Sequence, residues 1–145
     1  MFVLLFAIAL AGETRLDPAA LPATVVAAVQ ARLPGAVVVG AAQEGKEYEA
    51  EVTLGERKID LAFSADGTWL EEEERVAAET LPEAVRATLD KRWKGWTISR
   101  AERALSQSGT RFEVVIAKGE ARKEVALTEA GVVKQVETEE AEGDD

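Results

Sequence analysis

Apolar residues recur at a spacing of four in two stretches of the chain, and the two stretches match each other. The first is Leu21 to Gly35, LPATVVAAVQARLPG, and the second is Leu81 to Gly95, LPEAVRATLDKRWKG. A spacing of four places the apolar side chains on one stripe of an α-helix. A Pro near the start and a Gly after the end are typical helix boundaries. The pattern therefore predicts two helices, over about residues 22–33 and 82–93, within an internal duplication.

After each predicted helix the period changes from four to two. Residues 47–54 alternate strictly between apolar side chains and polar ones, and a shift of 64 positions aligns them with residues 111–118. In the second copy Phe112, Val114 and Ile116 are expected inside, with Glu113, Val115 and Ala117 outside. Such alternation is typical of an antiparallel strand with one buried and one solvated face. The offset grows from 60 at the helices to 64 here, and we interpret this as a four-residue insertion near residues 105–110 that makes a longer loop.

Turn residues divide the rest of each copy into further strands. The expected strands cover about residues 36–42, 47–54, 58–63 and 68–70 in the first copy, and 97–103, 111–118, 123–127 and 132–136 in the second. The predicted fold class is α+β. It consists of two tandem α-β-β-β-β repeats, whose antiparallel sheets each pack one helix on the apolar face.

The ends of the chain differ in composition from the repeats. Residues 2–11, FVLLFAIALA, are apolar but too few to span a bilayer, and Ala9-Leu10-Ala11 before Gly12 matches a small-x-small cleavage pattern. We expect a signal peptide at residues 1–11, although an N-terminal core strand or helix is an alternative. The expected order is then a linker at 12–20, repeat 1 at 21–73, a linker at 74–80, repeat 2 at 81–136 and an acidic disordered tail at 137–145.

Charge and composition narrow the possible functions. The net charge is −10, but the last nine residues carry six acids and no base, so the remainder has a charge of only −4. A nucleic-acid partner is not expected, because such proteins need a basic face. The chain has no Cys and no His, which excludes disulfides, thiol nucleophiles, zinc sites made of those residues and a lipid anchor on cysteine. We therefore expect no stable membrane anchor.

No pattern typical of catalysis is present. The four serines, Ser64, Ser99, Ser106 and Ser108, have no histidine to activate them. Carboxylates that could share an outward sheet face, such as Glu49, Glu51 and Asp60, suggest a Ca²⁺ site, but no loop has the calcium-binding spacing. We favour a solvated face as the explanation, with Arg57 and Lys58 relieving the repulsion across the strands. We predict no enzyme activity, no cofactor and no metal.

The residues that carry the duplication resemble a known family. The Leu-Pro helix start, the alternating YEAEV segment and KIDLAFSADGTWLEEE are similar to the PepSY-like domains grouped with β-lactamase inhibitor proteins. The resemblance covers both copies, about residues 21–136. The second copy departs from the first at Lys94, Trp96 and Ala130, where the first has Pro34, Ala36 and Asp66. The resemblance implies periplasmic or secreted proteins without catalytic residues, some of which bind and inhibit β-lactamases or peptidases.

A protein partner is therefore the expected ligand, although its identity and the oligomeric state are open. Trp93 and Trp69 are expected in the core, whereas Trp96 and the semi-exposed Leu70 are candidate apolar anchors. The candidate partner-binding residues are Trp96, Leu70, Glu49, Glu51, Asp60 and Glu113.

The functional hypothesis is a non-catalytic extracytoplasmic binding module that inhibits or modulates a hydrolase such as a peptidase or β-lactamase. Two alternatives are an envelope sensor that binds a small ligand or divalent cation on its acidic sheet face, and a structural domain without a specific partner.

Overall fold

A computed structural model describes residues 12–139, which fall into two compact units that we describe separately. The boundary lies between Glu71 and Glu72, so residues 12–71 form the first unit and residues 72–139 the second. The predicted signal peptide and residues 140–145 of the predicted tail lie outside the described residues.

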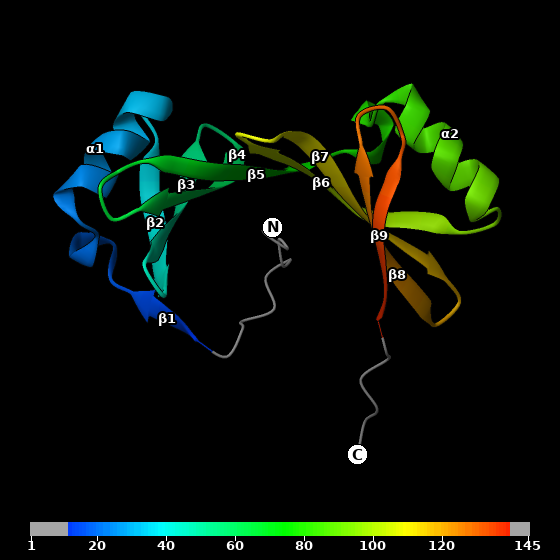
Figure 1. The fold of residues 1–145 in the computed structure, drawn as a ribbon, viewed down its shortest axis with the longest axis horizontal. Helices are drawn as coiled ribbons and strands as arrows, with labels where there is room; N and C mark the ends of the chain where they lie inside the picture. Colours follow the sequence, from blue (N-terminus) through cyan, green and yellow to red (C-terminus); the bar gives the residue numbers. More distant parts are fainter. Residues whose placement is uncertain (1–11, 140–145) are drawn as a thin grey trace, which may run out of the picture. The chain divides into compact units, whose positions relative to one another are not determined.

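The first unit contains one helix between a short strand and a meander of longer strands (Figure 1). Its elements are β1 (Glu13–Leu16), the 3₁₀ turn η1 (Pro18–Ala20), α1 (Ala23–Arg32), β2 (Val37–Glu44), β3 (Glu47–Leu54), β4 (Arg57–Ser64) and the start of β5 (Trp69–Val76). The pairs β1·β2, β2·β3 and β3·β4 are antiparallel.

The second unit repeats this plan. After the end of β5 come η2 (Ala78–Thr80), α2 (Glu83–Arg92), β6 (Thr97–Ser106), β7 (Gly109–Lys118), β8 (Ala121–Thr128) and β9 (Val133–Glu139). The pairs β6·β7, β7·β8 and β8·β9 are antiparallel, and within each unit the strand order follows the chain order. The predicted α+β class is confirmed: each of the two helices is followed by four antiparallel strands.

Each helix packs its apolar stripe on one face of its own unit's sheet. In the first unit Val25 and Val29 of α1 are fully buried and share a core with the alternating residues of β4, Ile59, Leu61 and Phe63. In the second, Val85 and Leu89 of α2 share a core with Val114, Val125 and Leu127. Burying side chains of this size stabilises the fold by about 1.5–3 kcal/mol each. The helix stripe and strand alternation read from the sequence therefore meet as predicted.

The four-residue insertion is not a loop, so that prediction is wrong. The strands β6 and β7 have 10 residues each, whereas β2 and β3 have 8 each. Ser106 pairs with Gly109, and only two residues form the turn. Two extra residues on each strand preserve the alternation, since side chains return to the same face with a period of two.

Regular structure also extends beyond the expected limits of the repeats. The stretches expected to be linkers hold β1 with η1, and the end of β5 with η2. The strand β9 continues to Glu139, so residues 137–139 of the expected tail pair with β8. Backbone pairing with a neighbouring strand outweighs local composition in these acidic segments.

The last β-turn of each unit lies against that unit's helix. The side chain of Thr24 in α1 donates a hydrogen bond to the carbonyl of Ala65 at 2.6 Å, and Thr88 in α2 donates one to the carbonyl of Gly131 at 2.8 Å. Gly67 and Gly131 sit at equivalent turn positions with φ of +87° and +79°, and their missing Cβ atoms leave room for the helix backbone. These contacts orient each helix on its sheet.

Candidate protein-binding face

The face of each sheet opposite its helix, called here the open face, carries most of the candidate residues. In the first unit, strand alternation and register place six acids and two bases on it: Glu13, Glu44, Glu47, Glu49, Glu51 and Asp60 against Arg15 and Lys58. Glu51 and Asp60 are direct neighbours across β3 and β4. One carboxylate oxygen of each of Glu49, Glu51 and Asp60 lies within 4.8 Å of the others. The predicted proximity of these three residues, the carboxylate cluster, is correct.

An arginine from β1 neutralises one member of the cluster. The guanidinium of Arg15 donates to both carboxylate oxygens of Glu51, with Nη1–Oε1 at 2.7 Å and Nη2–Oε2 at 3.3 Å. The side chain reaches across β2 at Gly40, which is the register partner of Glu51. A Cβ at Gly40 would overlap a carboxylate oxygen of Glu51 and lie 3.2 Å from Nη2 of Arg15. The absence of a side chain at Gly40 is therefore what lets this ion pair form.

The other two members of the cluster, Glu49 and Asp60, have raised pKa values. Burial, followed by the charges of Asp60, Glu13 and Glu51, raises the pKa of Glu49 to about 7. Burial and the charge of Glu51 also raise the pKa of Asp60. In contrast, the hydrogen bond from Arg15 lowers the pKa of Glu51. Raised carboxylate pKa values mean that the folded protein opposes full ionisation of this face near neutral pH.

Replacing Arg15 with glutamine should raise two pKa values at once. Glu51 loses its charged donor, and Glu49 loses the charge of Arg15, which lowers its pKa. Side-chain carboxyl chemical shifts followed by NMR between pH 3 and 9 would measure both changes. Lys46→Gln, in the exposed β2–β3 turn, is the matched control and should leave both midpoints in place. Unchanged midpoints in the Arg15 variant would contradict the assigned role of this arginine.

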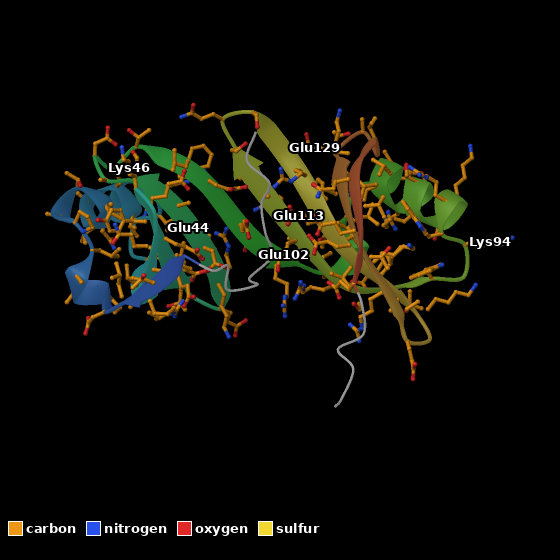
Figure 2. All side chains as sticks on the ribbon, turned by 60° about the horizontal axis from the view of Figure 1, so that its bottom comes forward. Glu44, Lys46, Lys94, Glu102, Glu113 and Glu129 are labelled. Carbon is orange, nitrogen blue, oxygen red and sulfur yellow. The ribbon has the colours of Figure 1, made fainter. Side chains whose placement is uncertain are left out.

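The open face of the second unit has different chemistry. Glu113 corresponds to Glu49 but is only 2% exposed, and its carboxylate lies 3.0 Å from Nη2 of Arg111. The expectation that Glu113 points into solvent is therefore wrong, because a guanidinium from its own strand packs on it. Glu102 is its register partner on β6 (Figure 2). Burial and the charges of Glu113, Glu137 and Glu139 raise the pKa of Glu124, the equivalent of Asp60, to about 7.

No family model matches the chain, and no curated protein matches it. Several solved structures match the chain. A BLIP-like protein from Bacteroides fragilis is 22% identical, with 86% of this chain and 90% of that chain covered and a TM-score of 0.71. A DUF2874 family protein from Bacteroides uniformis is 16% identical, with 81% and 88% covered and a TM-score of 0.74. A candidate periplasmic protein from Bacteroides eggerthii is 15% identical, with the same coverage and TM-score.

This chain has the fold of the BLIP-like and DUF2874 structures. The predicted resemblance is thus confirmed at the level of the fold. The matches cover most of both chains, so the BLIP-like fold includes both units. No helix within residues 12–139 is long and apolar enough to cross a membrane.

The aromatic candidates of this BLIP-like fold pack against the cores. Trp96 is half-buried against the second core, with Nζ of Lys123 5.9 Å from its ring centre. Trp69 packs against the first core beneath the guanidinium of Arg32 at 3.6 Å, and Trp93 packs against the second. Leu70 is half-buried, next to Trp69 in β5. Trp96 belongs to the second unit, whereas the carboxylate cluster belongs to the first.

The residue that sequence reasoning missed is Arg15, because it lies in the stretch taken as a linker. A signal for it was available. Extending the 60-residue shift upstream of the helices aligns Glu13 with Glu73, Arg15 with Arg75 and Leu16 with Val76. The repeat therefore begins with a strand before each helix, and that strand contributes an arginine.

Proposed function

We propose that this protein is a non-catalytic, extracytoplasmic binding module whose open sheet face docks onto a basic surface of a protein partner. On this proposal it inhibits or modulates a hydrolase of the peptidase or β-lactamase type. The observation that carries the proposal is the carboxylate cluster. Three acids approach within 4.8 Å on the face opposite the helix, and one arginine partly neutralises them.

Such crowding costs stability in the free protein, and it is common at functional sites. A lysine or arginine side chain of a partner would restore the ionised form of Glu49 and Asp60. Binding would then be favoured by the charges that destabilise the free module. The fold supports a protein-binding role, because a solved structure that shares it is described as BLIP-like, that is, similar to a β-lactamase inhibitor protein.

A divalent cation is the competing ligand of the same cluster, as in the sensor alternative. The geometry disfavours it, because Arg15 already engages both oxygens of Glu51. A cation would have to displace the guanidinium to gain a third carboxylate. Thermal unfolding with and without Ca²⁺ distinguishes the protein-binding proposal from the cation-sensor alternative. A rise in melting temperature with Ca²⁺ that Asp60→Asn abolishes would favour the cation sensor.

Partner capture with matched charge reversals tests the main proposal. The wild type, Glu49→Lys and Glu56→Lys would be used as bait in cross-linking against the exported protein fraction. Glu56 lies in the exposed turn between β3 and β4, away from the cluster. We expect one partner to be recovered by the wild type and Glu56→Lys but lost with Glu49→Lys. Equal recovery by all three would overturn the assignment to this face, and no specific partner would leave the structural alternative.

For the captured partner, the association rate constant should fall about tenfold or more between ~50 mM and ~500 mM salt, because screening removes long-range attraction. Stopped-flow fluorescence of the tryptophans would measure it. The dissociation rate should change much less. A salt-independent association rate would contradict electrostatic steering.

A further inference from the structure

Basic side chains gather at one end of the second unit, around the loop that follows α2. Lys91 and Arg92 lie in the last turn of the helix, and the exposed Lys94 follows on the loop (Figure 2). A Cβ at Gly95 would lie 3.7 Å from Nζ of Lys118, the last residue of β7. Two elements that are separate in the sequence therefore bring four bases together.

A fifth base, Lys123 in β8, joins this group from the side of the sheet that faces α2. Its register partner is the buried Ile116, and its ammonium lies 5.9 Å from the ring centre of Trp96. Within two residues of these bases in the sequence, the exposed acids are Asp90 and Glu120, so bases are in excess. We call the five bases the basic end: Lys91, Arg92, Lys94, Lys118 and Lys123.

The first unit has no basic end of this kind. At the equivalent positions four of the five bases are replaced by uncharged residues: Ala31, Pro34, Leu54 and Ile59. The structure supports the alignment, because a Cβ at Gly35 would lie 3.9 Å from Cδ1 of Leu54, as a Cβ at Gly95 would lie near Lys118. Four lysines therefore surround one loop of a protein whose net charge is −10. Such a local excess of positive charge attracts an acidic surface.

The first unit provides an acidic surface of matching chemistry, the carboxylate cluster on its open face. One oxygen each of Glu49, Glu51 and Asp60 lies within 4.8 Å of the others. An ammonium placed between two oxygens at that separation is within hydrogen-bond distance of both, and it has three donors. The hydrogen bonds of Arg15 go to Glu51, so an incoming ammonium would meet the carboxylates of Glu49 and Asp60.

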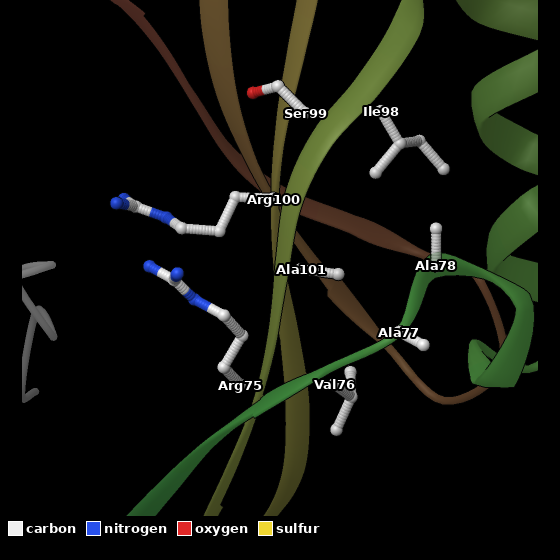
Figure 3. A pocket seen from close by; sticks show the side chains of 8 residues that line it. All are labelled: Arg75, Val76, Ala77, Ala78, Ile98, Ser99, Arg100 and Ala101. Atoms are coloured by element: carbon white, nitrogen blue, oxygen red, sulfur yellow. The ribbon is translucent and has the colours of Figure 1, made fainter. Parts of the chain in front are cut away.

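The open face of the second unit does not repeat this cluster. Val115 stands where the first unit has Glu51, and Arg100 stands where it has Gly40. Figure 3 shows the guanidinium groups of Arg75 and Arg100, which line one cavity, directed to the same side of the strands. A carboxylate is absent and a guanidinium is present at this place. The first open face is therefore the better match for a cation, and docking between copies would have one direction.

We infer that the basic end of one copy docks on the first open face of a second copy, with the ammonium of Lys94 in the carboxylate cluster. The inference is independent of the proposed function, because no other protein takes part, although a basic partner would compete for the same face. The contact joins two different surfaces, so each dimer keeps one of each and can grow. At physiological ionic strength the screening length is about 8 Å, so repulsion between distant charges of two acidic copies is weakened more than attraction at the contact.

Sedimentation velocity of the protein in about 150 mM salt, at concentrations from about 10 µM to 1 mM, tests the contact. We expect the weight-average sedimentation coefficient to rise with concentration, and a constant coefficient would overturn the inference. Lys94→Glu and Glu49→Lys should each lower the association constant at least tenfold, because each places like charges at the contact. Lys46→Glu and Glu56→Lys, in exposed turns of the first unit, make the same changes of charge and should associate as the wild type does.

Mixing the two disruptive variants gives the sharpest outcome. Glu49→Lys keeps the basic end and Lys94→Glu keeps the carboxylate cluster, so an equimolar mixture should associate at concentrations where each variant alone is monomeric. A monomeric mixture, or undiminished association of Lys94→Glu alone, would overturn the inference. If Glu49→Lys does not fold, the exposed Lys94→Glu still decides. Failure to capture a foreign partner would count against the proposed function and leaves these outcomes unaffected.

Discussion

Replacing Gly131 with alanine is expected to lower the free energy of unfolding by about 2 to 4 kcal/mol. The residue has φ of +79°, which an L side chain adopts only with strain. The new Cβ would overlap the carbonyl oxygen of Ala84 in α2 and lie 2.7 Å from Oγ1 of Thr88. The turn would have to move off the helix and lose the hydrogen bond from Thr88. Chemical denaturation followed by circular dichroism would measure the loss.

Gly119 provides the matched control for that experiment. It also has a positive φ, of +61°, but nothing lies within 4 Å of the Cβ position. Gly119→Ala should therefore lower the free energy of unfolding only through backbone strain, by about 1 kcal/mol. The difference between the two variants reports contact between the turn and the helix. Equal losses would show that the turn of the second unit does not depend on α2.

Replacing Glu49 with glutamine is expected to stabilise the protein above pH 7 and to leave it unchanged near pH 4. The pKa of Glu49 is about 7 in the folded state and near the ordinary 4.5 in the unfolded chain. Between these values the folded state binds more protons, so the free energy of unfolding falls as pH rises from about 4.5 to 7. The destabilisation caused by ionised Glu49 is therefore absent below about pH 4.5 and fully present above about pH 7. Glutamine removes it because it carries no charge.

The expected gain at pH 8 is about 1 to 2 kcal/mol, because solvent screening reduces the effect of a half-buried group below the full pKa shift. Unfolding curves of the wild type and Glu49→Gln, recorded at intervals from pH 4 to 8, would measure it. The control is Glu56→Gln in the exposed β3–β4 turn. Parallel stability profiles for the wild type and Glu49→Gln would contradict the assigned crowding of the cluster. If removal of the charge of Glu49 stabilises the protein and also abolishes partner binding, the carboxylate of Glu49 serves binding at the expense of stability.

Local pattern was enough to predict most of the elements. The expected helices, about 22–33 and 82–93, agree with α1 and α2 to within one residue at each end. The alternation of β3 and β7 placed Val52 and Val114 in the cores correctly. Periodicity succeeded here because each element buries one face, and burial imposes the spacing. It failed for β1 and the end of β5, whose polar sequences carry little of that signal and which depend on pairing with a neighbouring strand.

The candidate site was predicted in part. Register follows from alternation and turn length, so Glu49, Glu51 and Asp60 could be placed on one face from the sequence. Whether a carboxylate on that face is exposed could not be predicted. Glu49 and Glu113 occupy equivalent positions, yet only Glu113 lies under an arginine of its own strand. Alternation within a strand predicts on which face of the sheet a side chain lies. It does not predict which long side chains nearby cover that side chain.

The sequence by itself determined the duplication, the helix-on-sheet plan of each unit and the acidic character of the first open face, because all three follow from residue spacing within one element or one hairpin. Only the tertiary structure decided how the charges are paired. Arg15 meets Glu51 across the gap at Gly40, whereas Arg75 has no such carboxylate and shares a cavity with Arg100. Ion pairs form between residues far apart in the chain, and their geometry depends on strand register and on the space that a single glycine leaves open.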